Sequence, residues 1–493
     1  PPHHPPPPPG GAPAPPRGPG PPGPPPRPRP PHPPRGPSPP PAGALGPPTP
    51  PRRVVLGVDS STQSTKVVAV DVESGEVVAA ASAPHPPTDP PVSEQHPDAW
   101  WQALVAAVTE LGEVRGRVVA MSVAGQQHGL VVRGADGEVL RPAPLWNDTT
   151  AAPTIARLVD EIGPERWANA VGSVPVAAFT IAKLAHLAEH EPDVVRATRQ
   201  IGLPHDDLTW RLTGRRVTDR GDASGTGWFD PVTGEIRLDL LDIATGDAER
   251  LSDCLPAVLG PDEPAGTLTA EAASVLGLAT DVVVAAGTGD NMAAALGLGL
   301  ETGDVVISLG TSGTAYARSS VPTHDPTGAV AGFASADGAY LPLVCTLNAT
   351  KVTDTVARWL GTDAPGLAEL ALTAIDDPGT VELVPYFDGE RTPNLPDATG
   401  ELRGLTNATT PAQLALAAHD GVLRGLHAGI DALADAGADT GGRRILVGGG
   451  SRSAAYRRRA SDLCGQTVVV PDVGEAVAVG AARQAIEAWH AAV

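Results

Sequence analysis

The chain has 493 residues, enough for two or more domains, and its formal net charge is −21. The first fifty residues hold 28 of the 56 prolines and four arginines but no acidic residue, so residues 51–493 carry a net charge of −25. A body this acidic argues against nucleic acid and anionic membrane as partners, and no apolar run approaches the length of a membrane span.

Residues 1–52 are predicted to be a proline-rich, disordered leader with polyproline character. Such a segment cannot bury enough apolar surface to offset the entropy lost on ordering. A site for a proline-binding partner is one interpretation, but the composition favours a flexible tail or a start codon placed too far upstream.

Cysteine usage and the leader indicate the compartment. The leader lacks the apolar core of a secretory signal. Cys254, Cys345 and Cys464 lie far apart, without metal-ligand or CxxC spacing. This pattern is typical of the reducing cytosol, and we therefore expect a cytoplasmic protein.

The first ordered elements are predicted to be three short strands beginning near Arg53. The strands cover residues 54–57, 66–71 and 77–83, with the polar turn DSSTQSTK between the first two. An amphipathic helix is predicted over residues 96–111, followed by a strand over 118–123 that ends at the polar sequence AGQQHG. Strands and helices in this order indicate an α/β domain.

Residues 281–291, DVVVAAGTGDN, read as a buried parallel strand that runs into a tight glycine turn. Asp290 follows the carboxyl end of this strand, where open α/β sheets bind their ligands. A carboxylate at that place can accept a proton from a substrate hydroxyl. The alternative is that Asp290 is only the N-cap of the next helix, and this segment alone favours the cap.

The pattern restarts near residue 302. A strand at 305–309, a hydroxyl-rich turn at 310–314 and a strand from 315 repeat the arrangement that begins at residue 54. We interpret this as a degenerate internal duplication, with one domain over 53–301 and a second over 302–493. Later elements are predicted at 411–436 (helix), 445–447 (strand), 456–464 (helix), 467–470 (strand) and 475–489 (helix).

Three turns share one chemistry. Residues 59–65, 310–314 and 448–451 are rich in glycine or hydroxyl side chains, and each follows an apolar strand. Small residues let backbone N–H groups approach a phosphate, and Ser and Thr add donors. Together the turns predict a nucleotide held between two domains, although neither a Walker A motif nor a protein-kinase motif is present. Asp59 would hold Mg²⁺ through water, with an Asx-type turn as the alternative.

Nine segments, taken in order, resemble the FGGY carbohydrate kinases, and within that family they are most similar to the xylulokinases. They are GVDSSTQSTK (57–66), AGQQHG (124–129), LWND (145–148), LPHDDLTWRLTG (203–214), DASGTGWFD (222–230), GTGDN (287–291), SLGTSGT (308–314), PYFDGERTPN (385–394) and GGGSRS (448–453). The match runs from about residue 54 to 489. The chain ends soon after Trp489, where members of the family usually continue, which raises a question about the stability of the second domain.

The resemblance implies an α/β fold of two actin/hexokinase-like (ribonuclease H-like) domains with the active site in the cleft between them. It implies transfer of the ATP γ-phosphoryl group to a sugar, with Mg²⁺, converting D-xylulose to D-xylulose 5-phosphate. The alternatives are a kinase for another ketose or polyol and a non-catalytic sugar-binding regulator on the same fold. The expected partners are a small sugar and ATP, and a homodimer is left open.

The resemblance also assigns residues to roles. Asp290 matches the catalytic base, and Asp59 matches a second aspartate that is important for activity. The remaining assignments are Gln127, His128 and Asn291 for the sugar, and Ser61, Thr62, Lys66, Gly310, Thr311, Gly449 and Gly450 for ATP. Ser61 stands where many members of the wider family have Gly. Trp146 is left undecided between lining the sugar pocket and packing, and Arg391 is interpreted as a structural ion-pair residue.

Overall fold

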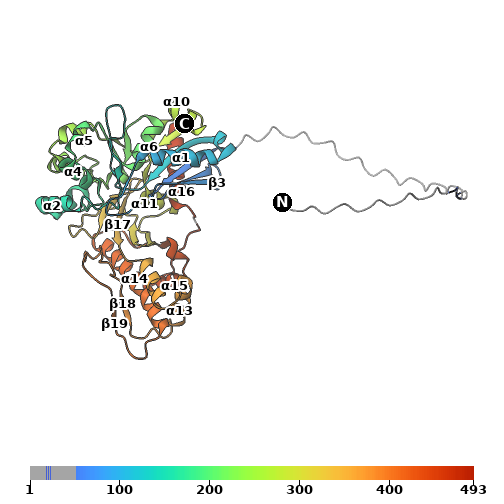
Figure 1. Ribbon diagram of the computed structural model, residues 1–493, viewed down its shortest axis with the longest axis vertical. Helices are drawn as coiled ribbons and strands as arrows, with labels where there is room; N and C mark the ends of the chain where they lie inside the picture. Colours follow the sequence, from blue (N-terminus) through green and yellow to red (C-terminus); the bar gives the residue numbers. More distant parts are fainter. Residues whose placement is uncertain (1–17, 19, 21–22, 24–51, 473) are drawn as a thin grey trace, which may run out of the picture. The chain divides into compact units, whose positions relative to one another are not determined.

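The computed structural model describes residues 18, 20, 23, 52–472 and 474–493. The predicted disorder of the leader therefore lies outside the described residues, apart from three isolated glycines and Arg52. The described residues from Arg52 onward belong to one unit, Pro51–Val493 (Figure 1).

A seven-stranded sheet organises the first lobe, in the order β11-β12-β5-β1-β2-β3, with β13 also paired to β5. Its central strand, β1, is antiparallel to β2 and parallel to β5. The strands are β1 (Val54–Ser60), β2 (Ser64–Asp71), β3 (Val77–Pro84), β5 (Val118–Gly125), β11 (Pro264–Thr267), β12 (Val283–Ala285) and β13 (Thr288–Gly289). The predicted first strand was too short, because β1 continues through Asp59.

All seven residues of β1 are buried because helices cover both of its faces. Alternate side chains of a strand point to opposite faces. Val54, Leu56 and Val58 accordingly join the core that contains Trp100 and Leu104 of helix α1 (Pro97–Glu110). Val55 instead joins a core built with alanines of helix α16 (Ala476–Ala492).

Helix α16 closes the chain but packs on the first sheet (Figure 1). Three glycines make its close approach possible. A Cβ added to Gly57 of β1 would lie 1.8 Å from the Ala478 carbonyl oxygen. Likewise, a Cβ on Gly480 would lie 1.7 Å from the Ala293 carbonyl oxygen, and one on Gly297 of α11 (Asp290–Leu298) would lie 1.9 Å from that of Ala476.

The second lobe contains a five-stranded sheet in the order β16-β17-β15-β14-β20. Strand β14 is antiparallel to β15 and parallel to β20, which repeats the relation of β1 to β2 and β5. The strands are β14 (Val305–Leu309), β15 (Gly313–Ala317), β16 (Ala331–Ala334), β17 (Tyr340–Thr346) and β20 (Arg444–Val447). The strand expected at 467–470 is reduced to a single bridge between Ile445 and Val469.

The remaining elements surround these sheets. The other helices of the first lobe are α2 (Ala152–Ile162), α3 (Pro164–Val171), α4 (Thr180–His190), α5 (Pro192–Ala197), α6 (Pro204–Thr213), α7 (Arg220–Ala223), α8 (Leu238–Thr245), α9 (Ala248–Ser252), α10 (Ala270–Leu276) and the 3₁₀ helix η1 (Gly112–Arg117). Those of the second are α12 (Thr350–Trp359), α13 (Ala364–Thr373), α14 (Pro411–Asp435), α15 (Ala454–Cys464) and η2 (Gly449–Arg452). Four two-stranded ribbons pair β4 (Glu94–Gln95) with β7 (Ala143–Pro144), β6 (Val131–Arg133) with β8 (Gln200–Gly202), β9 (Val217–Asp219) with β10 (Ala257–Leu259) and β18 (Glu382–Val384) with β19 (Glu401–Arg403).

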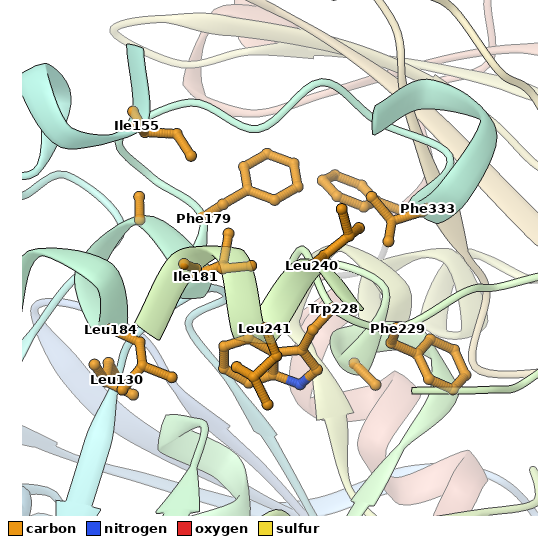
Figure 2. Close-up of a cluster of buried hydrophobic side chains, with 14 of the residues drawn as sticks. Leu130, Ile155, Phe179, Ile181, Leu184, Trp228, Phe229, Leu240, Leu241 and Phe333 are labelled. Atoms are coloured by element: carbon orange, nitrogen blue, oxygen red, sulfur yellow. The ribbon is translucent and has the colours of Figure 1, made fainter. Parts of the chain in front are cut away.

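The largest apolar core joins helices of the first lobe to the sheet of the second. Figure 2 shows the ring of Phe179 near that of Phe333 of β16, in the same cluster as Ile181 and Leu184 of α4 and Leu240 and Leu241 of α8. The ring centroids of Phe179 and Phe333 are 5.9 Å apart. In the part of the chain that the structure describes, no helix is long and apolar enough to cross a bilayer.

Candidate active site

A cavity lies where the two lobes meet. Its walls combine an apolar surface with a few polar groups, which is the usual make-up of a small-molecule site. The first lobe contributes Gln127, His128, Trp146, Val174, Ala178, Phe179, Asp290 and Asn291, and the second lobe contributes Thr314, Phe333, Leu343, Cys345 and Arg391 together with residues 328–331.

Asp290 is the first residue of α11, and Gly289 is the N-cap, so the capping interpretation of Asp290 was wrong. Its Oδ1 accepts a hydrogen bond of 2.8 Å from the Asn291 backbone N–H. Burial, followed by the negative charges of Asp59 and Asp222, raises the pKa of Asp290 to about 7. A carboxylate with this pKa is matched to general-base work near neutral pH.

Asp59 lies near the end of β1, beside Ala124 of β5 and opposite Lys66 of β2. Burial raises the pKa of Asp59 to about 6, although the positive charge of Lys66 acts in the other direction. Within residues 52–472 and 474–493 its carboxylate makes no hydrogen bond, so the Asx-type turn is absent there. The turn is closed instead by Ser61, whose N–H and Oγ both donate to the Ser64 carbonyl at 3.0 Å.

The three expected sugar-binding residues come together on one wall of the cavity. Asn291 donates from Nδ2 to the Gln127 Oε1 at 2.6 Å and to the Asp290 Oδ1 at 3.2 Å. The buried Gln127 Nε2 has no partner among the described residues. It therefore remains as a donor for a ligand.

His128 has a left-handed backbone with φ of 67°, which is uncommon for a residue other than glycine. Burial, with smaller contributions from the charges of Lys183 and Arg391, lowers the pKa of His128 to about 3. The ring is therefore neutral, and it stacks on Phe179 with centroids 5.0 Å apart. Because the Gly225 carbonyl 2.9 Å from Nδ1 can only accept, Nδ1 carries the hydrogen and Nε2 is an acceptor.

The first turn expected to bind phosphate is linked to the sugar cavity. Thr62 donates from Oγ1 to the Gln126 Oε1 at 3.0 Å and accepts from the Trp146 Nε1 at 2.9 Å. Trp146, which the sequence left undecided, therefore joins this turn to the cavity wall. Lys66 is paired with Glu475 at 2.9 Å, just before α16.

The other two turns lie against each other in the second lobe. The carbonyl of Gly310 accepts from the Thr350 N–H at 3.0 Å, and that of Thr311 from the Ala349 N–H at 3.4 Å. Gly449 and Gly450 belong to η2, and a Cβ on Gly450 would lie 2.7 Å from the Leu309 Cβ at the end of β14.

Lys183 was missed by the sequence reasoning. It lies in α4, and its side chain is buried without a carboxylate partner among the described residues. Its Nζ donates to the carbonyls of Ala177 at 3.2 Å and of Ala178, and so holds the cavity wall. Burial lowers the pKa of Lys183 to about 7. A lone lysine in a helix carries no signal that would have revealed this role.

A buried network around His205, which includes Asp222, was also missed. His205 of α6 contacts Asp222 through Nδ1 at 2.9 Å and Asp206 through Nε2 at 3.0 Å. Burial alone would lower the pKa of His205, but the carboxylates outweigh it and raise the pKa to about 9. The motifs 203–214 and 222–230 belong to the family pattern, but nothing in their spacing predicts that they meet.

Arg391 does not form the ion pair that was expected of it. Across the described residues its guanidinium has no carboxylate within salt-bridge distance, and it lines the cavity instead.

Comparisons with known proteins agree with this architecture. Residues 54–297 match the N-terminal domain of the FGGY family of carbohydrate kinases, and residues 305–489 match its C-terminal domain. The chain is 48% identical to a xylulose kinase of Streptomyces coelicolor over 88% of this chain and 87% of that protein. It is 36% identical to a xylulose kinase of Escherichia coli over 87% and 89% of the two chains.

A solved structure gives the same result. The xylulose kinase of Bifidobacterium adolescentis superposes with a TM-score of 0.82 at 40% identity, covering 89% of this chain and 93% of that one. The actin/hexokinase-like fold of two α/β domains is thus the fold of this protein. Taken with the two family matches, these relatives establish that the chain belongs to the FGGY family of carbohydrate kinases, enzymes that use ATP.

Proposed function

We propose that this protein transfers the γ-phosphoryl group of ATP to D-xylulose and produces D-xylulose 5-phosphate. The observation that carries the proposal is the position of Asp290. Its carboxyl group has a raised pKa and lines the same cavity as the neutral side chains of Gln127 and His128. The names of the most similar relatives, which are xylulose kinases, support the choice of sugar.

The sugar is held by donors and acceptors of complementary kind. The Gln127 Nε2 donates to a sugar oxygen, and the His128 Nε2 accepts from a sugar hydroxyl. Asn291 fixes the Gln127 amide by donating to its oxygen. A neutral sugar therefore meets uncharged partners, with Asp290 left to the hydroxyl that reacts.

Asp290 accepts the proton of the attacking hydroxyl as the new bond from oxygen to phosphorus forms. The hydroxyl oxygen attacks the γ-phosphorus in line with the leaving ADP oxygen. Exclusion of water from the cavity between the lobes keeps the phosphoryl group from being lost to hydrolysis.

ATP is proposed to lie along the three turns, with Ser61, Thr62, Lys66, Gly310 and Thr311 near its phosphates and Gly449 and Gly450 near the adenosine. The backbone N–H groups and hydroxyls of these turns offset the negative charge of the phosphates. The close packing of Gly450 on Leu309 supports one continuous surface formed by the second and third turns.

Magnesium fits the donor set. The carboxylate of Asp59 is buried and makes no hydrogen bond within the described residues, which suits a group that holds a hydrated cation. No group of three or more His, Cys, Asp or Glu side chains in the described part could hold an ion, so most of its ligands would be water and phosphate oxygens. When bound, the ion supplies positive charge that offsets charge on the phosphate oxygens.

The boundary near residue 302 and a cytoplasmic location are part of the same proposal. The family matches end at 297 and resume at 305, which supports the boundary, with α16 returning to the first sheet. All three cysteines are free thiols, which supports a reducing compartment. The oligomeric state, including a homodimer, is left to measurement.

An assay of ATP consumption across a panel of ketoses, polyols and aldonates tests the proposed function. We expect the highest kcat/KM for D-xylulose. A higher value for glycerol, ribulose or gluconate would replace D-xylulose as the assigned substrate. If no compound of the panel supported ATP consumption, the assignment as a kinase would be contradicted.

A further inference from the structure

Arg391 places a positive charge in a cavity that otherwise recognises a neutral sugar. Its guanidinium lines the same cavity as His128 and Asp290 but comes from the opposite lobe. In the described residues it has neither a salt bridge nor a side-chain hydrogen bond. A guanidinium without a partner in a ligand cavity is a candidate for binding an anion.

Glu390, the neighbouring acid, does not neutralise Arg391. Glu390 is buried, and its carboxylate accepts from the backbone N–H groups of Leu347 at 2.6 Å and Arg391 at 2.7 Å. It also accepts from the Asn348 Nδ2 at 3.0 Å, and the same amide donates to the Gly389 carbonyl at 2.7 Å. These bonds fix the backbone of the loop, so Arg391 is presented by a rigid support.

The same contacts place this loop beside the turn expected to bind the ATP phosphates. Leu347 and Asn348 directly precede the segment whose N–H groups hold Gly310 and Thr311. The second lobe also contributes Thr314 of β15 and Leu343 and Cys345 of β17 to the lining of this cavity. Arg391 therefore belongs to the side of the cavity from which a phosphoryl group would arrive.

The charges around the cavity indicate that the anion bound by Arg391 is a phosphoryl group. The sugar is neutral, whereas the cavity contains the carboxyl group of Asp290, and that of Asp59 is close enough to raise the pKa of Asp290; both would repel a phosphoryl group when ionised. The planar guanidinium can donate two parallel hydrogen bonds to a phosphate, which a lysine cannot do.

We propose that Arg391 is the phosphate-binding residue of the sugar pocket, holding the phosphoryl group during transfer and the phosphate of the sugar product afterwards. In this step the sugar hydroxyl oxygen bonds to the γ-phosphorus, the bond from phosphorus to the ADP oxygen breaks, and the proton passes to Asp290. Arg391 binds the non-bridging oxygens throughout. The inference rests on the proposed function and adds a residue of the second lobe to its site.

The test compares the affinity for an acceptor sugar with the affinity for its phosphate ester, measured by calorimetry without ATP. The acceptor is the best substrate of the panel assay, expected to be D-xylulose. In Arg391→Gln we expect affinity for the ester to fall about 10–100-fold, the range for losing a hydrogen bond to a charged group, and affinity for the sugar to change less than threefold. Arg391→Lys should lie between wild type and Arg391→Gln.

Two control variants separate phosphate binding from effects on folding. Arg403→Gln removes an exposed arginine of β19 that pairs with Glu401, and it should leave both affinities unchanged. Glu390→Gln perturbs the loop, and we expect it to weaken affinity for the sugar and the ester together. An equal loss of both affinities in a folded Arg391→Gln variant, or an unchanged affinity for the ester, would overturn the inference.

The panel assay on the wild-type protein tests the proposed function independently of the Arg391 variants. If the best acceptor is another sugar, the substrate assignment fails, and the Arg391 comparison proceeds with that sugar and its ester. A wild-type protein that phosphorylates no acceptor would overturn both proposals.

Discussion

Asn291 donates one amide hydrogen bond to Gln127 at 2.6 Å and another to Asp290 at 3.2 Å, so one side chain orients both the sugar-binding amide and the proposed base. Asn291 belongs to the first turn of α11, and Gln127 follows β5. The position of Asp290 relative to Gln127 is therefore set by the pairing with β5 of β13, the strand that directly precedes α11.

The pH dependence of kcat/KM should follow Asp290. Burial and the charge of Asp59 raise the pKa of Asp290 to about 7, and a base must be deprotonated to accept a proton. Activity should therefore fall about tenfold for each pH unit below 7, while His128 stays neutral and contributes nothing to this limb. The measurement is kcat/KM for the sugar from pH 5 to 9, and a flat profile over pH 5–7 would contradict the assignment.

Asp59→Ala should change both the Mg²⁺ dependence of turnover and the acidic limb of the pH profile, that is, the fall of kcat/KM below pH 7. Removing a negative charge that raises the pKa of Asp290 should move the limb to lower pH. Loss of the carboxylate should also raise the Mg²⁺ concentration needed for half-maximal turnover, with little effect on sugar affinity. If sugar affinity collapsed while the Mg²⁺ dependence was unchanged, the metal role of Asp59 would be wrong.

His128→Asn should raise the KM for the sugar and leave kcat nearly unchanged. Asn tolerates the left-handed backbone of this position, so the variant should fold. The lost bond from a sugar hydroxyl to Nε2 is made equally in the ground and transition states, and removing it costs about 2–10-fold in KM. A large fall in kcat at constant KM would show that His128 acts in the chemical step.

Gly480→Ala should destabilise the protein, whereas an alanine is normally favourable in a helix. The added Cβ would lie 1.7 Å from the Ala293 carbonyl, so α16 and α11 would have to separate, at a cost of about 1–3 kcal/mol. Gly425→Ala in α14 is the matched control, because its Cβ would meet nothing within 4 Å and should stabilise by about 0.5–1 kcal/mol. Denaturant unfolding compares the two, and equal stabilities would show that α11 and α16 separate at little cost.

How far the sequence predicted the structure depends on how far apart along the chain the interacting residues lie. The meander that begins at residue 54 and the strand at 305–309 were predicted because buried apolar runs bounded by polar turns are local signals. The packing of α16 on β1 was not predicted, since no local pattern says which sheet an alanine-rich helix will cover.

The candidate site follows the same rule. Asp290 was singled out because it follows a buried strand, whereas Gln127 and His128, which follow β5, were assigned through the resemblance to the family. The structure brings the two segments together because β12 and β13 pair in parallel with β5, so that their carboxyl ends meet. Lys183, the His205 network and the cavity position of Arg391 were missed because each depends on a contact between segments far apart in sequence. An ion pair was expected for Arg391 because a charge in an apolar segment suggests one. Its neighbour Glu390 instead accepts hydrogen bonds from two backbone N–H groups and the Asn348 side-chain amide.

Asp290→Asn is the decisive variant for the chemistry. Asn keeps the shape of the side chain and can still accept from the Asn291 backbone N–H, but it cannot take the proton of the hydroxyl. We expect kcat to fall about 10²–10⁴-fold, the usual contribution of a general base, and the acidic limb near pH 7 to disappear.

Stability provides the internal control for this variant. The pKa of Asp290 is raised in the folded protein, so its proton is bound more tightly in the folded than in the unfolded chain. Stability from this group is therefore fully present below the unfolded pKa of about 4 and is lost as pH rises through 7. At pH 8 the neutral Asn escapes this penalty, and the thermal midpoint of Asp290→Asn should equal or exceed that of wild type. A folded variant that retains nearly full activity would remove Asp290 from the chemical step, whereas low activity with a lower midpoint at pH 8 would indicate a structural defect.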